Sequence, residues 1–354
     1  MTTFIIRRLL VLPLILLGVT MLIFAMLQVM SPIERSALYV AEVPRNEAVL
    51  AGIIRRYGLD EPIPVQYWRW LTGTPDPVTG ETVGGVLRGD LGFSRTGREP
   101  VIDLLLRRFP ATLELALLSV IPIVGIGIWL GIQAALHHNK PIDQAARVFA
   151  ILGFSFPTFV FGLLMLLIFY AKLEWFPPGR LDPTLNQVVL SDNFNRYTYL
   201  ITVDSLLNLR FDIFLDALRH MVLPVITLSY LSWALLLKVT RSSMLEALRQ
   251  DFVVTARAKG LGERVVINRH VLKNALIPVA TISGATVASL LNGVVITESI
   301  FTYPGLGKAA ADAAVTLDVV TILGFALFNA LLFVLINLLV DVMYGVIDPR
   351  VRLS

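Results

Sequence analysis

The chain has 354 residues, of which 56% are hydrophobic and 16% charged, with a mean hydropathy of +0.73, a formal charge of +4 and no cysteine. Soluble domains carry roughly a quarter charged residues, so this composition argues against a soluble fold and favours a membrane protein. The basic residues form no aromatic-rich patch, which argues against nucleic acid as a partner, and the missing cysteines exclude disulfides and thiolate chemistry.

Six apolar runs are each predicted to cross a membrane as a helix. A helix rises about 1.5 Å per residue, so about 22 residues span roughly the 30 Å of a hydrocarbon core. Lipid offers the backbone no hydrogen-bond partner, which makes uninterrupted runs helical. The predicted fold is therefore an all-α integral membrane protein with six transmembrane helices, at residues 9–30, 115–136, 148–170, 221–237, 275–296 and 319–340.

The loops between these runs predict their orientation, because cytoplasmic loops carry an excess of Lys and Arg. Between residues 241 and 273, seven basic residues stand against three acidic ones. We therefore expect this loop and both termini in the cytoplasm, and the chain in the cell inner membrane as a multi-pass protein. The first run is expected to be retained rather than cleaved as a signal, since it is long and no small-residue cleavage site follows it.

The first outer segment, residues 31–109, is expected to form structure of its own. Apolar residues recur there at helical spacing and a glycine follows them: Val49, Leu50, Ile53, Ile54, Tyr57 and Gly58. This pattern predicts an amphipathic helix that ends at the glycine, while the Thr, Gly and Pro of residues 72–85 predict a mobile excursion. The chain thus divides into residues 1–30 with the first span, the outer segment 31–109, and a core 110–354 that holds the inner loop 241–275.

Ionisable groups are scarce inside the predicted spans. The four histidines lie in or beside loops, and four charged residues at the ends of runs are expected to anchor them: Glu114, Lys238, Glu298 and Asp341. Ion-driven carriers keep charges deep in their spans and enzymes need a base beside a nucleophile, so both classes are disfavoured. Gly127 and Gly131 are expected to permit close helix packing. A passive channel and a transporter powered by another subunit both stay open.

The inner loop holds the most informative pattern. Apolar or small residues recur every four positions and a glycine closes the series: Met244, Leu248, Phe252, Ala256 and Gly260. This spacing predicts one short amphipathic helix that ends at the glycine, with Arg249, Arg257 and Lys259 beside its apolar stripe. Such a helix either docks on a cytoplasmic protein or rests on lipid headgroups.

Residues 241–278, RSSMLEALRQDFVVTARAKGLGERVVINRHVLKNALIP, resemble the coupling loop of the permease subunits in the dipeptide and oligopeptide family of ABC importers. The resemblance covers most of the chain in order, through GLDEPIPVQYWRWL, GDLGFSRTG, RRFPATLELALL, TESIFTYPGLG and LVDVMYGVIDPR. Loop strings such as TARAKGLGER and YPGLG are not dictated by hydrophobicity, so they make it specific. The chain departs from the family pattern at Val254, where the general signature has a glutamate, and in residues 36–46 and 72–85.

The resemblance implies a type I ABC importer permease fold with a cytoplasmic coupling helix. The ATPase-coupling residues that it implies are Asp251, Thr255, Ala256, Arg257, Ala258, Lys259, Gly260 and Leu261. No GxxxxGK[ST] phosphate loop occurs, so we expect no cofactor, metal or catalytic residue on this chain, with ATP and Mg²⁺ on partner subunits. The implied partners are a second homologous permease, one or two ATP-binding subunits and an extracytoplasmic binding protein. Peptides are the expected cargo, with nickel complexes and oligosaccharides as alternatives.

Overall fold

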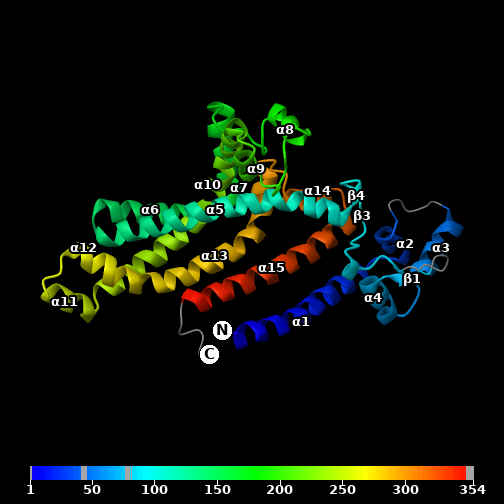
Figure 1. Cartoon of the computed structure of the whole chain (residues 1–354), viewed down its shortest axis with the longest axis horizontal. Coiled ribbons are helices and arrows are strands. Elements are labelled where there is room, and N and C mark those ends of the chain that lie inside the picture. The colour runs from blue at the N-terminus through cyan, green and yellow to red at the C-terminus, as the bar shows by residue number, and fades with distance from the viewer. Residues whose placement is uncertain (1, 41–45, 76–79, 81, 348–354) are drawn as a thin grey trace. The chain divides into compact units, whose positions relative to one another are not determined.

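The computed structural model describes residues 2–40, 46–75, 80 and 82–347, and its elements are labelled in Figure 1. The chain divides into two compact units. The first consists of Met1–Phe109 and Lys308–Leu339, and the second of Pro110–Gly307 and Val340–Ser354. Helices dominate both units, which confirms the predicted all-α class.

The first unit holds one long helix from each end of the chain and a set of short elements. Its core contains Phe24, Leu27, Trp70 and Leu323. Its elements are α1 (Thr2–Leu27), α2 (Pro32–Arg35), η1 (Ser36–Leu38), α3 (Glu47–Tyr57), α4 (Ile63–Thr72), β1 (Thr74–Pro75), β2 (Thr82–Val83), η2 (Val86–Arg88), β3 (Phe93–Ser94), β4 (Glu99–Pro100) and most of α15 (Val319–Ile347).

The outer segment largely follows its prediction. Helix α3 ends at Gly58, whose φ of 64° is left-handed, and the Leu59 N–H donates to the Ile54 carbonyl at 2.9 Å, so the predicted amphipathic helix and its glycine stop are confirmed. Within the excursion 72–85, β1 and β2 pair antiparallel, as do β3 and β4 after it. Residues 76–79 and 81 of that excursion, and 41–45 of the stretch 36–46, lie outside the described residues.

The second unit is built from long helices and the loops that join them. Three helices cross the boundary between units in the chain: α5 (Val101–Leu136) enters this unit at Pro110, α14 (Leu306–Val315) leaves it after Gly307, and α15 re-enters it at Val340. The other elements are α6 (Pro141–Ser155), α7 (Thr158–Met165), the π-helical turn η3 (Leu166–Lys172), α8 (Pro183–Leu190), α9 (Ile201–Leu207), α10 (Phe211–Leu248), α11 (Asp251–Ala258), α12 (Glu263–Val265), the π-helical turn η4 (Val266–Val271) and α13 (Leu272–Ile300).

Four helices among the described residues are long and apolar enough to cross a membrane: α1, α5, α10 and α15. The third predicted span, residues 148–170, is not one straight helix, because α6 and α7 meet at 105°. Phe156 is extended there (φ −93°, ψ 123°), as expected for the residue before Pro157. Counted as one span, this bent pair brings the number to five, and α13 covers the fifth predicted run. The count of six stays a prediction.

Three polar residues predicted at helix ends or in loops are buried. Glu114 lies inside α5 with 2% of its surface exposed, Glu298 lies in the last turn of α13, near the predicted end, with 0%, and His220 is buried in α10. The expectation that the two glutamates are end anchors is therefore wrong, because both are enclosed by other segments of the second unit. Lys238 is exposed, and the side chain of Asp341 lies outside the described ones.

Small residues bring α5, α6 and α10 close together in the second unit. A Cβ added to Gly131 would lie 2.5 Å from the Thr240 Cβ, and one added to Gly153 would lie 2.7 Å from the Ala234 Cβ. Gly127 faces α10 in the same way. The packing role predicted for Gly127 and Gly131 is confirmed, since side chains at these positions would force the helices apart.

Candidate functional site

The inner loop forms two helices where the four-residue spacing predicts one. Helix α10 ends before Gln250, which is extended (φ −76°, ψ 150°), and α11 starts after it. This break shifts the phase of the second helix, so Phe252 is 36% exposed while its neighbour Val253 is fully buried. The predicted continuous stripe is therefore wrong, and Val253 and Ala256 form the inward face of α11.

Helix α11 is held by one hydrophobic cluster. Val253 and Ala256 pack in it with side chains from α5, α10, η4 and α13: Ala135, Met244, Ala247, Val266, Val271 and Ala275. Complete burial of a valine side chain contributes about 1.5–3 kcal/mol. An eight-residue helix is marginal by itself, so this cluster fixes its position.

The end of α11 is a Schellman motif. The Leu261 N–H donates to the Ala256 carbonyl at 3.3 Å and the Gly260 N–H donates to the Arg257 carbonyl at 2.9 Å. Gly260 has φ of 78°, and a Cβ added to it would meet no atom within 4 Å. Backbone conformation rather than space therefore requires glycine here. The predicted stop at Gly260 is confirmed.

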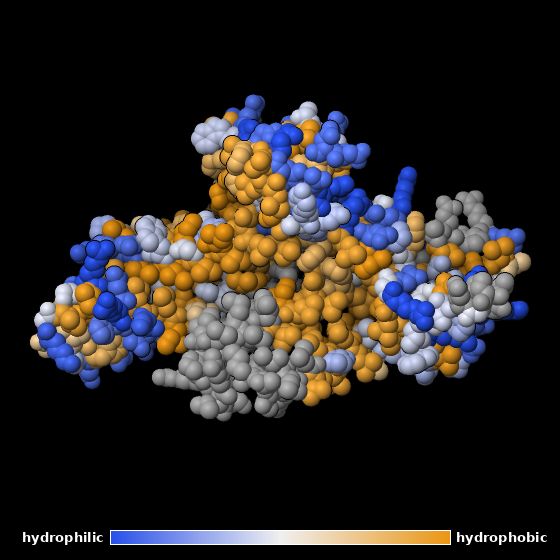
Figure 2. Space-filling model, in the orientation of Figure 1, coloured by the Kyte–Doolittle hydropathy of each residue, from blue (hydrophilic) through white to orange (hydrophobic). Residues whose placement is uncertain are grey.

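The face of α11 away from the cluster is open. Of the eight residues implied as coupling residues, Ala256 is buried and seven are exposed: Asp251, Thr255, Arg257, Ala258, Lys259, Gly260 and Leu261. Val254 beside them is 61% exposed. Arg257 donates to Glu263 at 2.5 and 3.1 Å, and this hydrogen bond holds the pKa of the Glu263 carboxyl below its ordinary value. Figure 2 shows hydrophilic side chains gathered where α11 and α12 lie.

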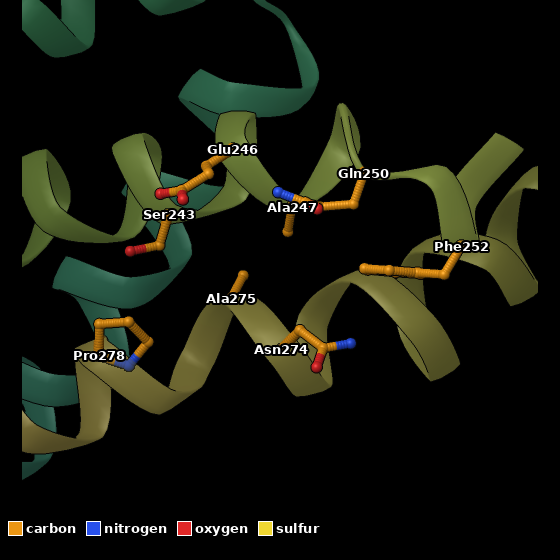
Figure 3. A pocket seen from close by; sticks show the side chains of 8 residues that line it. All are labelled: Ser243, Glu246, Ala247, Gln250, Phe252, Asn274, Ala275 and Pro278. Atoms are coloured by element: carbon orange, nitrogen blue, oxygen red, sulfur yellow. The ribbon is translucent and has the colours of Figure 1, made fainter.

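A pocket of about 320 Å³ lies between α10, α11 and α13. Two small side chains, Ala247 and Ala275, point toward each other across the pocket in Figure 3. The lining also carries one carboxylate, from Glu246, and two amides, from Gln250 and Asn274. The lining residues are Ser243, Glu246, Ala247, Gln250, Phe252, Asn274, Ala275 and Pro278. Sequence reasoning missed this pocket because its two walls come from opposite ends of the loop. The described residues contain no cluster that could hold a metal ion.

A buried polar cluster that joins α5 to the last turn of α13 is the second notable arrangement. Glu114 accepts two hydrogen bonds from Arg180, at 2.6 and 3.1 Å, and two from Thr202, at 2.6 and 2.8 Å. Hydrogen bonds between a guanidinium and a carboxylate are charge-assisted and therefore strong. They tie α5 to the loop before α8 and to α9, so Glu114 fixes these two segments against α5.

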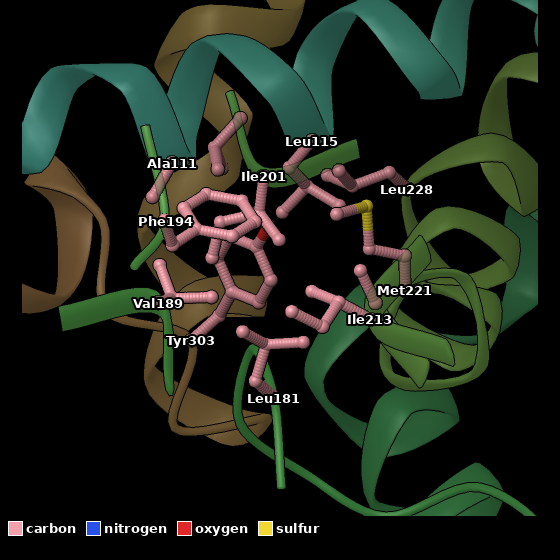
Figure 4. Packing of buried hydrophobic residues seen from close by; sticks show 12 residues of the cluster. Ala111, Leu115, Leu181, Val189, Phe194, Ile201, Ile213, Met221, Leu228 and Tyr303 are labelled. Atoms are coloured by element: carbon pink, nitrogen blue, oxygen red, sulfur yellow. The ribbon is translucent and has the colours of Figure 1, made fainter. Parts of the chain in front are cut away.

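The loop YPGLG, residues 303–307, closes over the other carboxylate of this cluster. Thr112 donates to Glu298 at 2.6 Å and accepts from the Leu306 N–H at 2.8 Å. A Cβ added to Gly305 would overlap the Glu298 carboxylate, which explains the glycine. Tyr303 is wholly buried in the adjoining hydrophobic cluster (Figure 4), and this burial raises the pKa of its hydroxyl.

Comparison with known families gives two matches that together cover almost the whole chain. The model of the binding-protein-dependent transport system inner membrane component matches residues 126–353. The model of the N-terminal part of binding-protein-dependent transport system membrane components matches residues 1–116. The inner loop, the pocket and α13 lie in the first match, and the outer segment 31–109 lies in the second.

Curated relatives match over their full length. The chain is 38% identical over 355 residues to the di/tripeptide transport system permease protein DppB of Pseudomonas aeruginosa, with 99% of both chains covered. It is 37% identical over 356 residues to the dipeptide transport system permease protein DppB of Escherichia coli, again with 99% of both covered. It is 35% identical over 354 residues to the oligopeptide transport system permease protein AppB of Bacillus subtilis, covering 99% of this chain and 100% of the relative.

Proposed function

Because the chain belongs to the family of binding-protein-dependent transport system inner membrane components, we propose that α11 couples it to an ATP-hydrolysing partner. The chain is the transmembrane subunit of a peptide ABC importer and spans the inner membrane several times. Its family works with partners of the ATPase and substrate-binding protein kinds, and the permease subunits of this family lack an ATPase site of their own.

The observation that carries the proposal is the division of α11 into a fixed face and an open face. Val253 and Ala256 lock the helix to α10 and α13, while Phe252, Val254 and Leu261 expose apolar surface outside the predicted spans. Exposed apolar side chains gathered on one short helix favour a protein partner. The partner that this surface fits is an ATPase subunit with an apolar cleft.

In the proposed mechanism, closure of two ATPase subunits around ATP and Mg²⁺ displaces α11. The displacement passes to α10 and α13 because the cluster around Val253 joins all three helices. Well-packed interfaces transmit such shifts as rigid bodies. Asp251, Thr255, Arg257, Ala258, Lys259, Gly260 and Leu261 would touch the ATPase, and buried Ala256 would hold the helix in place.

The remaining parts of the importer follow from the same proposal. Both termini and the inner loop face the cytoplasm, where a basic loop is expected. A second homologous permease completes the path, and the segments 31–109 and 171–220 receive a loaded binding protein on the outer side. The cargo is short peptides, in agreement with the names of the relatives.

The experiment that tests this function compares two matched substitutions in the complete importer, purified and placed in proteoliposomes. Val254→Asp puts a charge on the open face of α11, and Leu209→Asp puts one on a 76% exposed leucine of the segment between α9 and α10. We expect Val254→Asp to reduce the ATPase subunit that copurifies and ATP-driven uptake by about tenfold or more. Leu209→Asp leaves the amount of ATPase subunit unchanged. Equal retention in both variants contradicts the proposal, and uptake without ATP indicates a passive channel.

A further inference from the structure

A buried ion pair lies beside the inner loop and has no part in the site described above. Asp143, in the first turn of α6, is fully buried. Arg241 of α10 donates to both of its carboxylate oxygens, from Nε to Oδ1 at 2.5 Å and from Nη2 to Oδ2 at 2.9 Å. The two parallel hydrogen bonds hold the planar guanidinium in one orientation, so the pair resists rotation as well as separation.

Asp143 also closes the turn between α5 and α6. The Asn139 N–H donates to Asp143 Oδ2 at 3.0 Å, and Asn139 itself is left-handed with φ of 60°. Two further basic groups face the same oxygen, with His138 Nδ1 at 3.4 Å and Arg147 Nη2 at 3.7 Å. One carboxylate therefore fixes the turn and the neighbouring helix α10 at once.

Arg241 lies close to α11, so the ion pair connects α6 to the end of α10 that carries this helix. Arg241 lies seven residues before the last residue of α10, or roughly 10 Å along a helix, and α11 follows directly. In addition to the ion pair, α5, α6 and α10 share a cluster of small and apolar side chains: Ala134, Ala146, Ala150, Ala234 and Leu237. At its far end, α6 reaches the 105° break before α7.

We propose that Asp143 and Arg241 are a positioning pair that makes α6 move together with the coupling helix, an inference that rests on the function proposed for α11. A shift of the inner end of α10 reaches α6 through the bidentate bonds, and the break before Pro157 lets α6 turn without carrying α7 rigidly along. The small-residue contacts keep the three helices in register, but apolar contacts allow sliding that directional hydrogen bonds prevent.

The first test measures ATP hydrolysed per peptide imported, in the complete importer reconstituted with its binding protein. Asp143→Asn keeps the shape of the side chain and removes its charge. Arg241→Lys keeps the positive charge and removes the planar guanidinium that bonds both carboxylate oxygens. The control is Lys308→Ala, which breaks the 3.0 Å pair of Lys308 with Asp312 on α14. We expect both pair variants to assemble and hydrolyse ATP while uptake falls about tenfold, and the control to keep the normal ratio. A normal ratio in Asp143→Asn overturns the proposal.

A second test replaces the ion pair with a covalent link, which the cysteine-free chain permits. In the double variant Asp143→Cys and Arg241→Cys, a cleavable bifunctional thiol reagent joins the two positions. Linked protein is expected to import peptide better than unlinked protein, and cleavage is expected to abolish the gain. No gain on linking overturns the positioning role.

The outcomes also separate this inference from the function on which it rests. If Val254→Asp retains the ATPase subunit and normal uptake, the coupling role of α11 itself fails. If Val254→Asp loses the ATPase subunit while Asp143→Asn keeps a normal ratio of ATP to peptide, only the positioning pair fails.

Discussion

The inner loop and the buried polar cluster of the second unit are both rich in charge, yet they are built in opposite ways. Around α11 the polar contacts are local, from a Schellman motif to an ion pair six residues apart, and most polar side chains are exposed. Around Glu114 and Glu298 the partners are distant in sequence, and the carboxylates are buried. Local, exposed structure can be displaced cheaply, whereas buried, long-range structure resists change. We infer that the loop is the moving part and the cluster the fixed one.

The largest expected effect comes from breaking the buried cluster. Arg180→Ala leaves the Glu114 carboxylate buried without its charged partner, which typically costs about 3–5 kcal/mol. The free energy of unfolding of the purified protein in detergent measures this loss. Arg257→Ala on the exposed loop is the matched control and should barely change it. Comparable small losses in both variants would remove the contrast between the two regions.

A smaller effect is expected from Gly305→Ala in the YPGLG loop. The added methyl group would overlap the Glu298 carboxylate and push it away from Thr112. Overpacking of this kind costs about 1–3 kcal/mol. Thermal unfolding of the variant would show the loss, and Thr112→Val should cost less in this background than in the parent protein, because one of the two hydrogen bonds that it removes is already broken. Full additivity of the two substitutions would contradict this explanation.

The next effect in size belongs to the end of α11. Gly260→Ala forces a side chain into the left-handed region, at about 1–2 kcal/mol, although no atom stands in its way. We expect the last turn of α11 to fray and coupled uptake to fall. Gly262→Ala is the control, because Gly262 has an ordinary φ of −62° and equally open space. Equal uptake by the two variants would show that the glycine stop is dispensable.

The smallest effect is the pH dependence of the exposed Arg257–Glu263 pair. The pKa of Glu263 lies below its ordinary value of 4.5 because Arg257 donates to its carboxylate. A lowered folded-state pKa means that the pair stabilises the protein above pH 4.5 and loses this contribution as the pH falls through the lowered value. The protein should therefore be slightly more stable than Glu263→Gln at pH 7, with the difference vanishing in acid. A stability difference between the protein and Glu263→Gln that grows in acid would contradict this role of the pair.

Much of the fold could be predicted from sequence because its signals are local. Apolar runs marked the long helices, and Gly58 and Gly260 marked helix ends, since a left-handed cap is a property of a few neighbouring residues. The break in the third run was not predicted, because the sequence alone does not distinguish a bend from a break of about a right angle at Pro157. Proline permits either outcome, and packing decides between them.

The site was only partly predictable for the same reason. The position of α11 followed from its motif, but the turn at Gln250 moved the inward face from Phe252 to Val253, because one break changes the phase of every later residue. Glu114 looked like an end anchor because its partners, Arg180 and Thr202, lie far along the chain. The YPGLG string was the only local sign of that cluster, through the glycine that Glu298 requires.

Cross-linking would show whether the open face of α11 docks on an ATPase. The chain has no cysteine, so a single Val254→Cys variant can be treated in assembled membranes with a short thiol-to-amine reagent, with Leu209→Cys as the control. We predict a cross-linked product of Val254→Cys with the ATPase subunit and none from Leu209→Cys. Cross-linking of Val254→Cys to lipid or to no protein at all, in complexes that still import peptide, would contradict it.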